Sequence, residues 1–317
     1  MNLLVTGGAG FIGSHVCERL LHDGHAVWAF DDLNPFYDPQ LKRRNLRDIQ
    51  SLAKPFEFVH GDLCDSGALT ELFSSVKFDQ VIHLAARAGV RPSLAEPALY
   101  QRVNVEGTVN LLEAARKNGV NKIVLASSSS VYGVNSKVQF SESDPIFSAI
   151  SPYAASKLAY ESLGHVYHHV YGLDVAVFRL FTVYGPRQRP DLAIRKFAAL
   201  IQAGKPIPVF GDGSMARDYT YVTDTVDGII AATQQEIGFQ IFNLGESQTV
   251  SLIRLVELLE GALGKKALID RQPAQPGDVP VTFADIAKAR DRLGYQPQIK
   301  IETGIKLFID WFRKNTG

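Results

Sequence analysis

The chain of 317 residues has little cysteine, no net charge and no long apolar run. Its two cysteines, Cys17 and Cys64, cannot build a disulfide framework or a zinc site with paired thiolate ligands. Lys+Arg and Asp+Glu are both 33, and this balance removes the overall positive charge that binding to nucleic acids or anionic membranes would need, although it leaves local basic spots open. No segment reaches the run of about 20 apolar residues that spans a membrane, and a strand-like segment, not a signal peptide, follows Met1. We expect a soluble, cytoplasmic protein without a metal, nucleic-acid or membrane partner.

Short apolar runs alternate with helical patterns through the first half of the chain. Runs typical of buried strands lie at residues 3–6, 26–30, 56–60, 80–84, 122–126 and 175–180. Helical spacing between them, seen at residues 14–23 and 104–118, indicates βαβ units. We therefore expect an α/β protein with a Rossmann-type, doubly wound parallel sheet.

The second half of the chain is less regular. Helices are predicted at residues 192–203, 224–233 and 251–263, and strands at residues 219–222 and 239–244. The second of these helices is expected to be capped by Thr223 or Asp224, and the third by Ser251. We expect a large domain of residues 1–180 and a smaller mixed α/β domain of residues 181–317, between which the chain can cross back.

A glycine-rich turn joins the first predicted strand to the first predicted helix. Gly7, Gly10 and Gly13 have the spacing GxxGxxG. Glycines at these positions let the backbone turn tightly and approach a pyrophosphate, which rests on the N-terminus of the helix. Tight turns also collect glycines, but a strand before and a helix after are the context that a dinucleotide-binding motif requires. We assign this turn, with Phe11 and Ile12, to the cofactor.

Acidic and small residues end the strands that would lie beside this turn. Asp31 stands about 20 residues after the glycines, where a carboxylate bonds ribose hydroxyls and repels a 2′-phosphate, so NAD is expected and not NADP. A solvated turn residue would also explain Asp31. Asp62 is expected to accept a hydrogen bond from the adenine amino group, or to cap a helix, and His83 to be packed in the core. The other residues that we assign to NAD are Asp32, Asn34, Leu63, Leu84, Ala85 and Ala86.

Tyr153 and Lys157 lie four residues apart, on one face of a helix. A phenol ordinarily titrates at about 10, but a nearby lysine cation and the positive nicotinamide of NAD favour the phenolate and lower its pKa. The preceding strand ends in ASSSSVYG, residues 126–133, whose hydroxyls can bond the same substrate oxygen. A YxxxK pair alone also suits an ordinary amphipathic helix. With the glycine turn and the serine-rich strand end before it, the pair indicates hydride transfer at a carbinol.

These motifs together resemble an extended short-chain dehydrogenase/reductase of the nucleotide-sugar epimerase and dehydratase group, over almost the whole chain. The resemblance implies a catalytic triad of Ser128, Tyr153 and Lys157, a tightly bound NAD that is regenerated in each turnover, and a C-terminal domain that binds the nucleotide sugar. Ser128 lies four residues before Tyr132 of the VYG tripeptide. Ser130, two residues before that tyrosine, is the second candidate.

The residues before the VYG tripeptide indicate the reaction. Dehydratases of the resembling group carry an Asp–Glu pair there, and UDP-glucuronate decarboxylases carry a glutamate. This chain has Ser129 and Ser130. Removing a proton from C5 of the sugar needs a base at that position. The sequence therefore favours epimerisation, in which hydride leaves C4 and returns to its other face.

Several stretches resemble UDP-glucuronate 4-epimerases more than UDP-glucose 4-epimerases: residues 33–38, 86–91, 184–191 and 275–279. Glucuronate carries a carboxylate, for which arginine is the natural partner. Arg189 is the first candidate for it, ahead of Arg187 and Arg91, although diphosphate binding or solvation would also explain these arginines. The resemblance further implies Arg217 at the diphosphate, Asp278 at a ribose, Val209 near the uracil, Thr182 beside the pyrophosphate or sugar, and Arg87 at the substrate.

Other functions stay open at this point. They are a UDP-glucose/UDP-galactose 4-epimerase, a UDP-glucuronate decarboxylase, which the missing glutamate disfavours, and a non-catalytic NAD-binding regulatory protein, which would not need the Tyr153–Lys157 pair. The resemblance also implies a homodimer formed by helices at residues 103–118 and 153–171. Apolar residues of the second helix could serve that contact or belong to the core of one chain. They are Val166, Tyr167, Val170 and Tyr171.

Overall fold

A parallel sheet of seven strands forms the centre of the computed structural model, which describes residues 1–134, 137, 139–146, 148–273 and 279–315. The strand order is β10-β6-β5-β4-β1-β2-β3. The strands are β1 (Asn2–Thr6), β2 (Ala26–Asp31), β3 (Phe56–His60), β4 (Gln80–His83), β5 (Lys122–Ser128), β6 (Asp174–Leu180) and β10 (Phe239–Leu244). The order reverses beside β1, and this switch point is where open parallel sheets bind their ligands. The predicted Rossmann-type α/β fold is confirmed.

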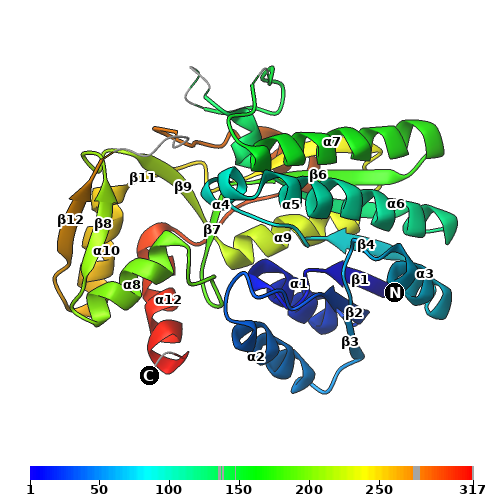
Figure 1. Cartoon of the computed structure of the whole chain (residues 1–317), viewed down its shortest axis with the longest axis horizontal. Helices are drawn as coiled ribbons and strands as arrows, with labels where there is room; N and C mark the ends of the chain where they lie inside the picture. Colours follow the sequence, from blue (N-terminus) through cyan, green and yellow to red (C-terminus); the bar gives the residue numbers. More distant parts are fainter. Residues whose placement is uncertain (135–136, 138, 147, 274–278, 316–317) are drawn as a thin grey trace.

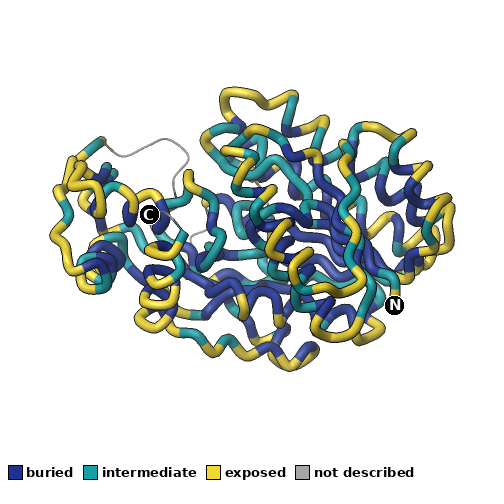
Figure 2. Tube along the Cα trace, turned by 90° about the horizontal axis from the view of Figure 1, so that it is seen from below, coloured by how far each residue is buried: buried dark blue, intermediate teal, exposed yellow. Residues whose placement is uncertain are grey.

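Helices cover both faces of the sheet (Figure 1). The helices α1 (Phe11–His22), α2 (Pro39–Gln50) and α9 (Val222–Thr233) lie on one face, and α3 (Ser66–Ser75), α6 (Gly107–Lys117) and α7 (Pro152–Tyr171) lie on the other. Successive residues of β1 alternate between the two cores: Leu3 and Val5 pack with α1, and Leu4 packs with α6. The inner strands β1, β4, β5 and β6 are buried on both faces (Figure 2), which is why they are continuous apolar runs in the sequence.

Most predicted strands and helices are found, with ends shifted by a few residues. The helix predicted at residues 104–118 begins as a π turn, Arg102–Glu106, before α6. The predicted cap of α9 is wrong, because the helix begins at Val222 without a side-chain cap. Asp224 instead accepts hydrogen bonds from the backbone of Gln298 and Ile299, at 3.1 and 3.0 Å. It therefore ties α9 to the chain that precedes the last helix.

A smaller lobe is built from the second half of the chain. Its elements are α8 (Ala193–Gln202), α10 (Leu252–Leu263) and α12 (Ile301–Asn315), the parallel pair β8 (Pro206–Phe210) and β12 (Leu268–Gln272), and the sheet of β7 (Thr182–Tyr184), β9 (Ala216–Tyr221) and β11 (Thr249–Ser251). The helix α10 begins at the predicted cap, where Ser251 Oγ accepts from Arg254 N at 3.2 Å. Between β9 and β11 the chain crosses back to the large lobe, where α9 packs on α1 and β10 extends the large sheet beside β6 (Figure 1). The two lobes are therefore not two continuous segments.

Within the described residues, every helix is too short or too polar to span a bilayer. No group of three or more His, Cys, Asp or Glu side chains in this part of the chain could hold a metal ion.

Candidate active site

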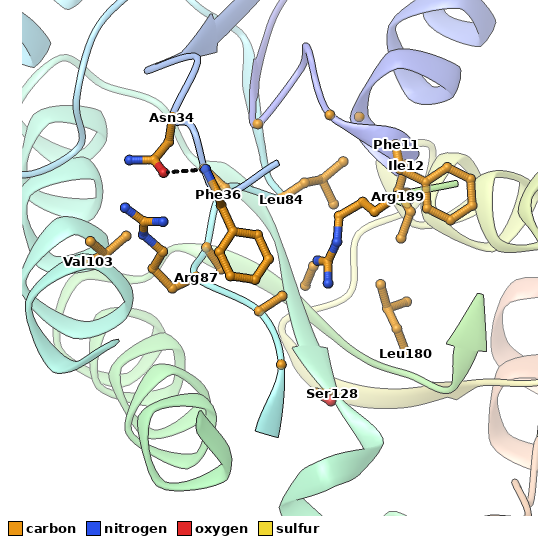
Figure 3. Close-up of a pocket in the computed structure, with 18 of the residues that line it drawn as sticks. Phe11, Ile12, Asn34, Phe36, Leu84, Arg87, Val103, Ser128, Leu180 and Arg189 are labelled. Atoms are coloured by element: carbon orange, nitrogen blue, oxygen red, sulfur yellow. Dashed lines mark hydrogen bonds between the residues drawn. The ribbon is translucent and has the colours of Figure 1, made fainter. Parts of the chain in front are cut away.

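A cavity of about 410 Å³ opens at the carboxyl ends of β1, β2, β4 and β5, beside the switch point of the sheet. All the residues that the sequence assigns to the cofactor line it: Gly7, Gly10, Phe11, Ile12, Gly13, Asp31, Asp32, Asn34, Asp62, Leu63, Leu84, Ala85, Ala86, Tyr153 and Lys157. Five of the residues assigned to the substrate also line it: Arg87, Ser128, Ser130, Thr182 and Arg189. Figure 3 shows side chains from both halves of the chain reaching into this cavity.

The glycine turn has the geometry that a dinucleotide requires. Gly7 has a φ of +70°, and a Cβ there would lie 2.8 Å from the backbone nitrogen of Ala85 on the neighbouring strand end. A Cβ on Gly13 would lie 2.1 Å from the carbonyl oxygen of Gly7. Gly10 precedes α1 without a side-chain cap, so the first N–H groups of the helix have no side-chain acceptor. The turn therefore offers a helix N-terminus and a close backbone approach to a pyrophosphate.

Asp31 ends β2 inside the cavity and is only 5% exposed. Its Oδ1 accepts hydrogen bonds from Lys42 Nζ and from Leu33 N, both at 2.9 Å. Lys42 is buried in α2 and lines the same cavity, and it was not among the residues expected there. A lysine eleven residues after a strand end is an unremarkable sequence feature. The structure thus places the expected ribose acid beside a paired cation, and a solvated turn residue no longer describes it.

Asp62 lies two residues after the end of β3, lines the cavity and does not cap a helix. Its Oδ1 accepts a hydrogen bond from Cys64 N at 2.9 Å. The cap of α3 is Asp65, which accepts from Gly67 N at 2.9 Å and from Ala68 N at 3.1 Å. This finding removes the helix cap as an explanation for Asp62.

His83 lies behind the cavity and is fully buried, as expected of a core residue. Its Nδ1 is 2.6 Å from Thr6 Oγ1 and its Nε2 is 3.0 Å from Thr108 Oγ1. Thr108 donates its proton to the carbonyl of Asn104, so Nε2 carries the imidazole proton and Nδ1 accepts from Thr6. Burial, aided by the charge of Lys157, lowers the pKa of His83 to about 3. The neutral ring joins the ends of β1 and β4 behind the glycine turn.

Tyr153 and Ser128 meet at the wall of the cavity. Ser151 caps α7 by accepting a hydrogen bond from Ala154 N at 3.1 Å, which places Tyr153 in the first turn of the helix. The side chain of Ser128, at the end of β5, is close enough to the phenol to affect its pKa. Burial raises the pKa of Tyr153, while the Ser128 hydroxyl and the charge of Arg189 lower it. Burial outweighs the other two effects, so the pKa of Tyr153 is raised in this structure, and the lowered pKa expected from the sequence is not found.

Lys157 lies one turn further along α7, on the same face of the helix. It is fully enclosed, donates to the carbonyl of Ala126 at 2.6 Å and lies 4.1 Å from the centre of the Tyr160 ring. Burial lowers the pKa of Lys157 to about 7, against the charge of Glu161, which raises it. The fold thus brings together the three residues of the predicted triad.

Two arginines frame an aromatic wall of the same cavity. Arg189 makes two hydrogen bonds to Asp191, at 3.0 and 2.8 Å, and its guanidinium lies 5.4 Å from the centre of the Phe36 ring. Arg87 lies 6.0 Å from the same centre, and Figure 3 shows Phe36 between the two arginines. Because the charge of Arg189 acts on Tyr153, it can bind an anionic group of a molecule that the tyrosine contacts.

The remaining substrate candidates do not line this cavity. Arg187 departs most from expectation: it donates to Glu18 of α1 at 2.7 Å and lies 3.5 Å from Asp48, so its side chain joins the lobes. Arg91 lies 4.6 Å from the centre of the Phe210 ring. The others are Arg217, which donates to the carbonyls of Ala216 and Pro280, Val209, which is buried, and Asp278, which lies outside the described residues.

Sequence reasoning also missed Asn104, in the π turn. Its Oδ1 accepts from Arg87 N at 2.8 Å, and its Nδ2 donates to Arg87 O at 3.0 Å and to Ser156 Oγ at 2.9 Å. It therefore fastens the loop after β4, which lines the cavity, to α7, which carries Tyr153 and Lys157. The available signal was an asparagine, fully buried in the structure, within a helical apolar pattern.

Comparison with known proteins agrees with this geometry. A family model described as GDP-mannose 4,6 dehydratase matches residues 4–308. The UDP-glucuronate 4-epimerase of Thermodesulfobacterium geofontis is 45% identical over 313 residues, which are 98% of this chain and 96% of that protein. The structure of Bacillus cereus UDP-glucuronic acid 4-epimerase with UDP-glucuronic acid and NAD is 36% identical, covers 99% of both chains and has a TM-score of 0.93.

A second solved structure is that of a neutral-sugar enzyme. The UDP-glucose 4-epimerase of Thermotoga maritima with UDP-glucose is 34% identical, covers 100% of both chains and has a TM-score of 0.92. The matches to the family model and to these proteins extend over nearly the whole chain. The chain belongs to the GDP-mannose 4,6 dehydratase family of extended short-chain dehydrogenases/reductases.

Proposed function

We propose that this protein is an NAD-dependent epimerase that inverts C4 of UDP-glucuronate and forms UDP-galacturonate. The observation that carries the proposal is the meeting of Tyr153, Ser128 and Arg189 in one cavity beside a dinucleotide-binding turn. Relatives named UDP-glucuronate 4-epimerase at about 45% identity support the same reaction.

The residues of the triad have separate tasks. Tyr153 takes the proton of the C4 hydroxyl, and Ser128 holds the oxygen as it becomes a carbonyl. Lys157 supplies positive charge that favours the phenolate. NAD, when bound, accepts the C4 hydride and later returns it, and the glycine turn with Asp31, Asp62 and the loop after β4 would hold it. Between the transfers the 4-keto sugar turns about its bond to the diphosphate, and Tyr153 then returns the proton to the inverted centre.

The carboxylate of glucuronate makes this intermediate reactive. A 4-keto group is β to that carboxylate, and such acids lose CO₂ when the breaking bond aligns with the carbonyl π system. Paired hydrogen bonds from Arg189 keep the carboxylate charge localised and its plane fixed, which disfavours this loss. Ser129 and Ser130 stand where a base for C5 would be needed, so proton removal there is disfavoured too.

One observation favours a neutral hexose as the second candidate substrate. Arg189 already makes a bidentate pair with Asp191, so a substrate carboxylate must compete for it. UDP-glucose would leave this pair intact. The proposal therefore predicts that the glucuronate carboxylate displaces Asp191.

The decisive experiment incubates the purified protein with UDP-glucuronate, and with UDP-glucose in parallel, without added NAD. Proton NMR resolves the products. Formation of UDP-galacturonate supports the reaction and a resident cofactor together. Release of a UDP-pentose would show that the carboxylate is not protected, and turnover of UDP-glucose alone would assign the enzyme to neutral sugars.

We also propose a homodimer through α6 and α7, which lie side by side on the outer face of the large lobe (Figure 1). Val166, Val170 and Tyr171 are 46%, 59% and 48% exposed on α7. Tyr167 belongs to the core of one chain, since it is buried and donates to Glu113 at 2.9 Å. Val170→Asp should give monomers in sedimentation velocity, whereas the matched change Leu307→Asp, at an exposed apolar residue of α12, should not.

A cytoplasmic location is part of the proposal. Cys17 and Cys64 are both unpaired, which suits a reducing compartment. Fractionation of the source cells tests it, and recovery outside the cytosolic fraction would contradict it.

A further inference from the structure

A buried ion pair lies directly behind the triad and has no part in the mechanism above. Arg179 on β6 donates to both oxygens of Glu161 on α7, from Nε at 3.0 Å and from Nη2 at 2.8 Å. Ser127 on β5 donates to Glu161 Oε1 at 2.6 Å. The side chains of Arg179 and Glu161 are only 5% and 6% exposed. Three donors on one enclosed carboxylate form the pattern of an ionised glutamate that is held rigidly.

These residues belong to the elements that carry the triad. Glu161 follows Lys157 by one turn of α7, on the same face of the helix. Ser127 immediately precedes Ser128 at the end of β5, and Arg179 is the register partner of Ser127 on β6. The end of β5, and with it Ser128, is therefore held by a carboxylate that an arginine clamps in place.

Stability alone does not account for this pair. Removing two charges from water costs about as much as their attraction returns, so well-packed apolar residues of similar volume serve the core at least as well. The Glu161–Arg179 pair lies one turn of α7 away from the buried Lys157. This placement indicates that the pair acts on the charge of Lys157.

Lys157 is surrounded by ionisable groups from three elements. They are Tyr153, Tyr160 and Glu161 on α7, His83 on β4, and Arg179 on β6 behind Glu161. The pKa of His83 is about 3, so its ring is neutral, and burial raises the pKa values of both tyrosines, so they are neutral as well. Burial pulls the pKa of Lys157 down to about 7, and the charge of Glu161 pulls it up.

We propose that Glu161 is a positioning residue for the triad: it fixes the end of β5 through Ser127 and supplies the negative charge that keeps Lys157 an ammonium. Arg179 holds that carboxylate in place and stacks on the ring of Tyr132, 4.8 Å from its centre, in the turn after Ser128. The inference rests on the proposed epimerase activity, in which the charge of Lys157 favours the phenolate of Tyr153.

The test compares the pH profile of kcat/KM for UDP-glucuronate in the wild-type protein, Glu161→Gln and Glu161→Asp. Glutamine keeps the shape of the side chain but removes its charge, so Lys157 loses its proton at lower pH. The alkaline limb of the profile should move down by about one pH unit, so that the loss of kcat/KM rises to about tenfold at high pH. Aspartate keeps the charge and should leave the limb in place with a lower kcat. Glu71→Gln, at an exposed glutamate of α3, is the control for the substitution itself.

A second measurement does not depend on turnover. Carbon-13 NMR of lysine side chains, with the signal assigned by Lys157→Met, gives the titration of Lys157 directly, and Glu161→Gln should lower its midpoint by the same amount. If Glu161→Gln does not fold, the double variant Glu161→Leu/Arg179→Met removes both charges without leaving one unpaired, and should shift the midpoint in the same direction. An unchanged Lys157 titration in the folded variant overturns the inference. A wild-type protein without epimerase activity overturns the proposed function instead, because the titration is still measured.

Discussion

Lys42 Nζ lies 2.9 Å from Oδ1 of Asp31, so the acid that ends β2 is paired with an ammonium inside the cofactor cavity. The usual reason for NAD preference is that a carboxylate at this position repels the 2′-phosphate of NADP. Here the carboxylate also neutralises a buried cation, and that cation is a natural partner for a phosphate. The preference for NAD over NADP therefore depends on the ion pair between Asp31 and Lys42.

We predict that Asp31→Asn converts this site toward NADP. Loss of the carboxylate leaves the ammonium of Lys42 only its longer pair with Asp32, at 3.8 Å, and removes an acceptor for ribose hydroxyls, so NAD should bind about tenfold more weakly. NADP should bind more tightly than it does to the wild-type protein. Calorimetric titration of nucleotide-free protein with each dinucleotide measures the two affinities. Asp32 Oδ1 lies farther from Lys42 Nζ, at 3.8 Å, so Asp32→Asn should shift the ratio of the two affinities in the same direction but by less. Equal weakening of both dinucleotides in Asp31→Asn would contradict the argument.

The fold could be predicted because the sequence patterns that indicate it each lie within a few consecutive residues. Residues of β1 face two cores in turn, so the strand is apolar throughout, and the glycines that follow must occupy a turn that no side chain fits. The start of α9 could not be predicted in the same way. Asp224 reads as a helix cap, but its partners Gln298 and Ile299 are more than 70 positions away and become neighbours only after folding.

In the candidate site, too, the features fixed by neighbouring residues could be predicted, and those fixed by distant residues could not. Arg187 and Arg189 are two residues apart, and both suit an anionic substrate by residue type. In the structure Arg187 has a φ of +64°, and its side chain bonds Glu18, 169 positions earlier in the chain, while Arg189 enters the cavity. A left-handed arginine has no signature in the sequence, so the direction of each side chain could not be predicted. The glycine turn and the Tyr153–Lys157 spacing could be, because neighbours along the chain determine both.

Ser128 and Ser130 can now be distinguished by their contacts. Ser128 Oγ donates to Ser130 Oγ at 3.1 Å and accepts from Ser130 N at 3.2 Å, and Ser128, unlike Ser130, affects the pKa of Tyr153. Ser130 therefore reaches the tyrosine only through Ser128. We predict that Ser128→Ala lowers kcat by about a hundredfold, as loss of a hydrogen bond to the reacting oxygen does, and that Ser130→Ala lowers it by less than about tenfold. Steady-state rates with unchanged NAD content measure this, and a larger loss in Ser130→Ala would reverse the assignment.

His83 should make the protein sensitive to acid. Its pKa in the folded protein is about 3, against 6.5 for a free imidazole, so the unfolded chain binds a proton between these values that the folded chain does not. Stability linked to this group is complete above pH 6.5 and is lost as the pH falls toward 3. In His83→Gln the fall in the free energy of unfolding between pH 7 and pH 5 should be smaller by about 2 kcal/mol. Urea unfolding at both pH values measures this difference, which is independent of any constant loss of packing. An equal fall in the two proteins would show that His83 is not neutral in the fold.

Arg189 and Asp191 together should determine which sugar is accepted. If the glucuronate carboxylate displaces Asp191 from the guanidinium, Arg189→Ala lowers kcat/KM for UDP-glucuronate by about a hundredfold and for UDP-glucose by only a few-fold, because a charged hydrogen-bonding partner is lost for one substrate alone. Asp191→Asn acts in the opposite direction: it removes the competing carboxylate and should lower KM for UDP-glucuronate. The product mixture of Arg189→Ala is equally informative, since a carboxylate that is no longer held should give some UDP-pentose by loss of CO₂. If Arg189→Ala lowers kcat/KM equally for the two sugars and forms no UDP-pentose, Arg189 instead binds the diphosphate, which the two substrates share.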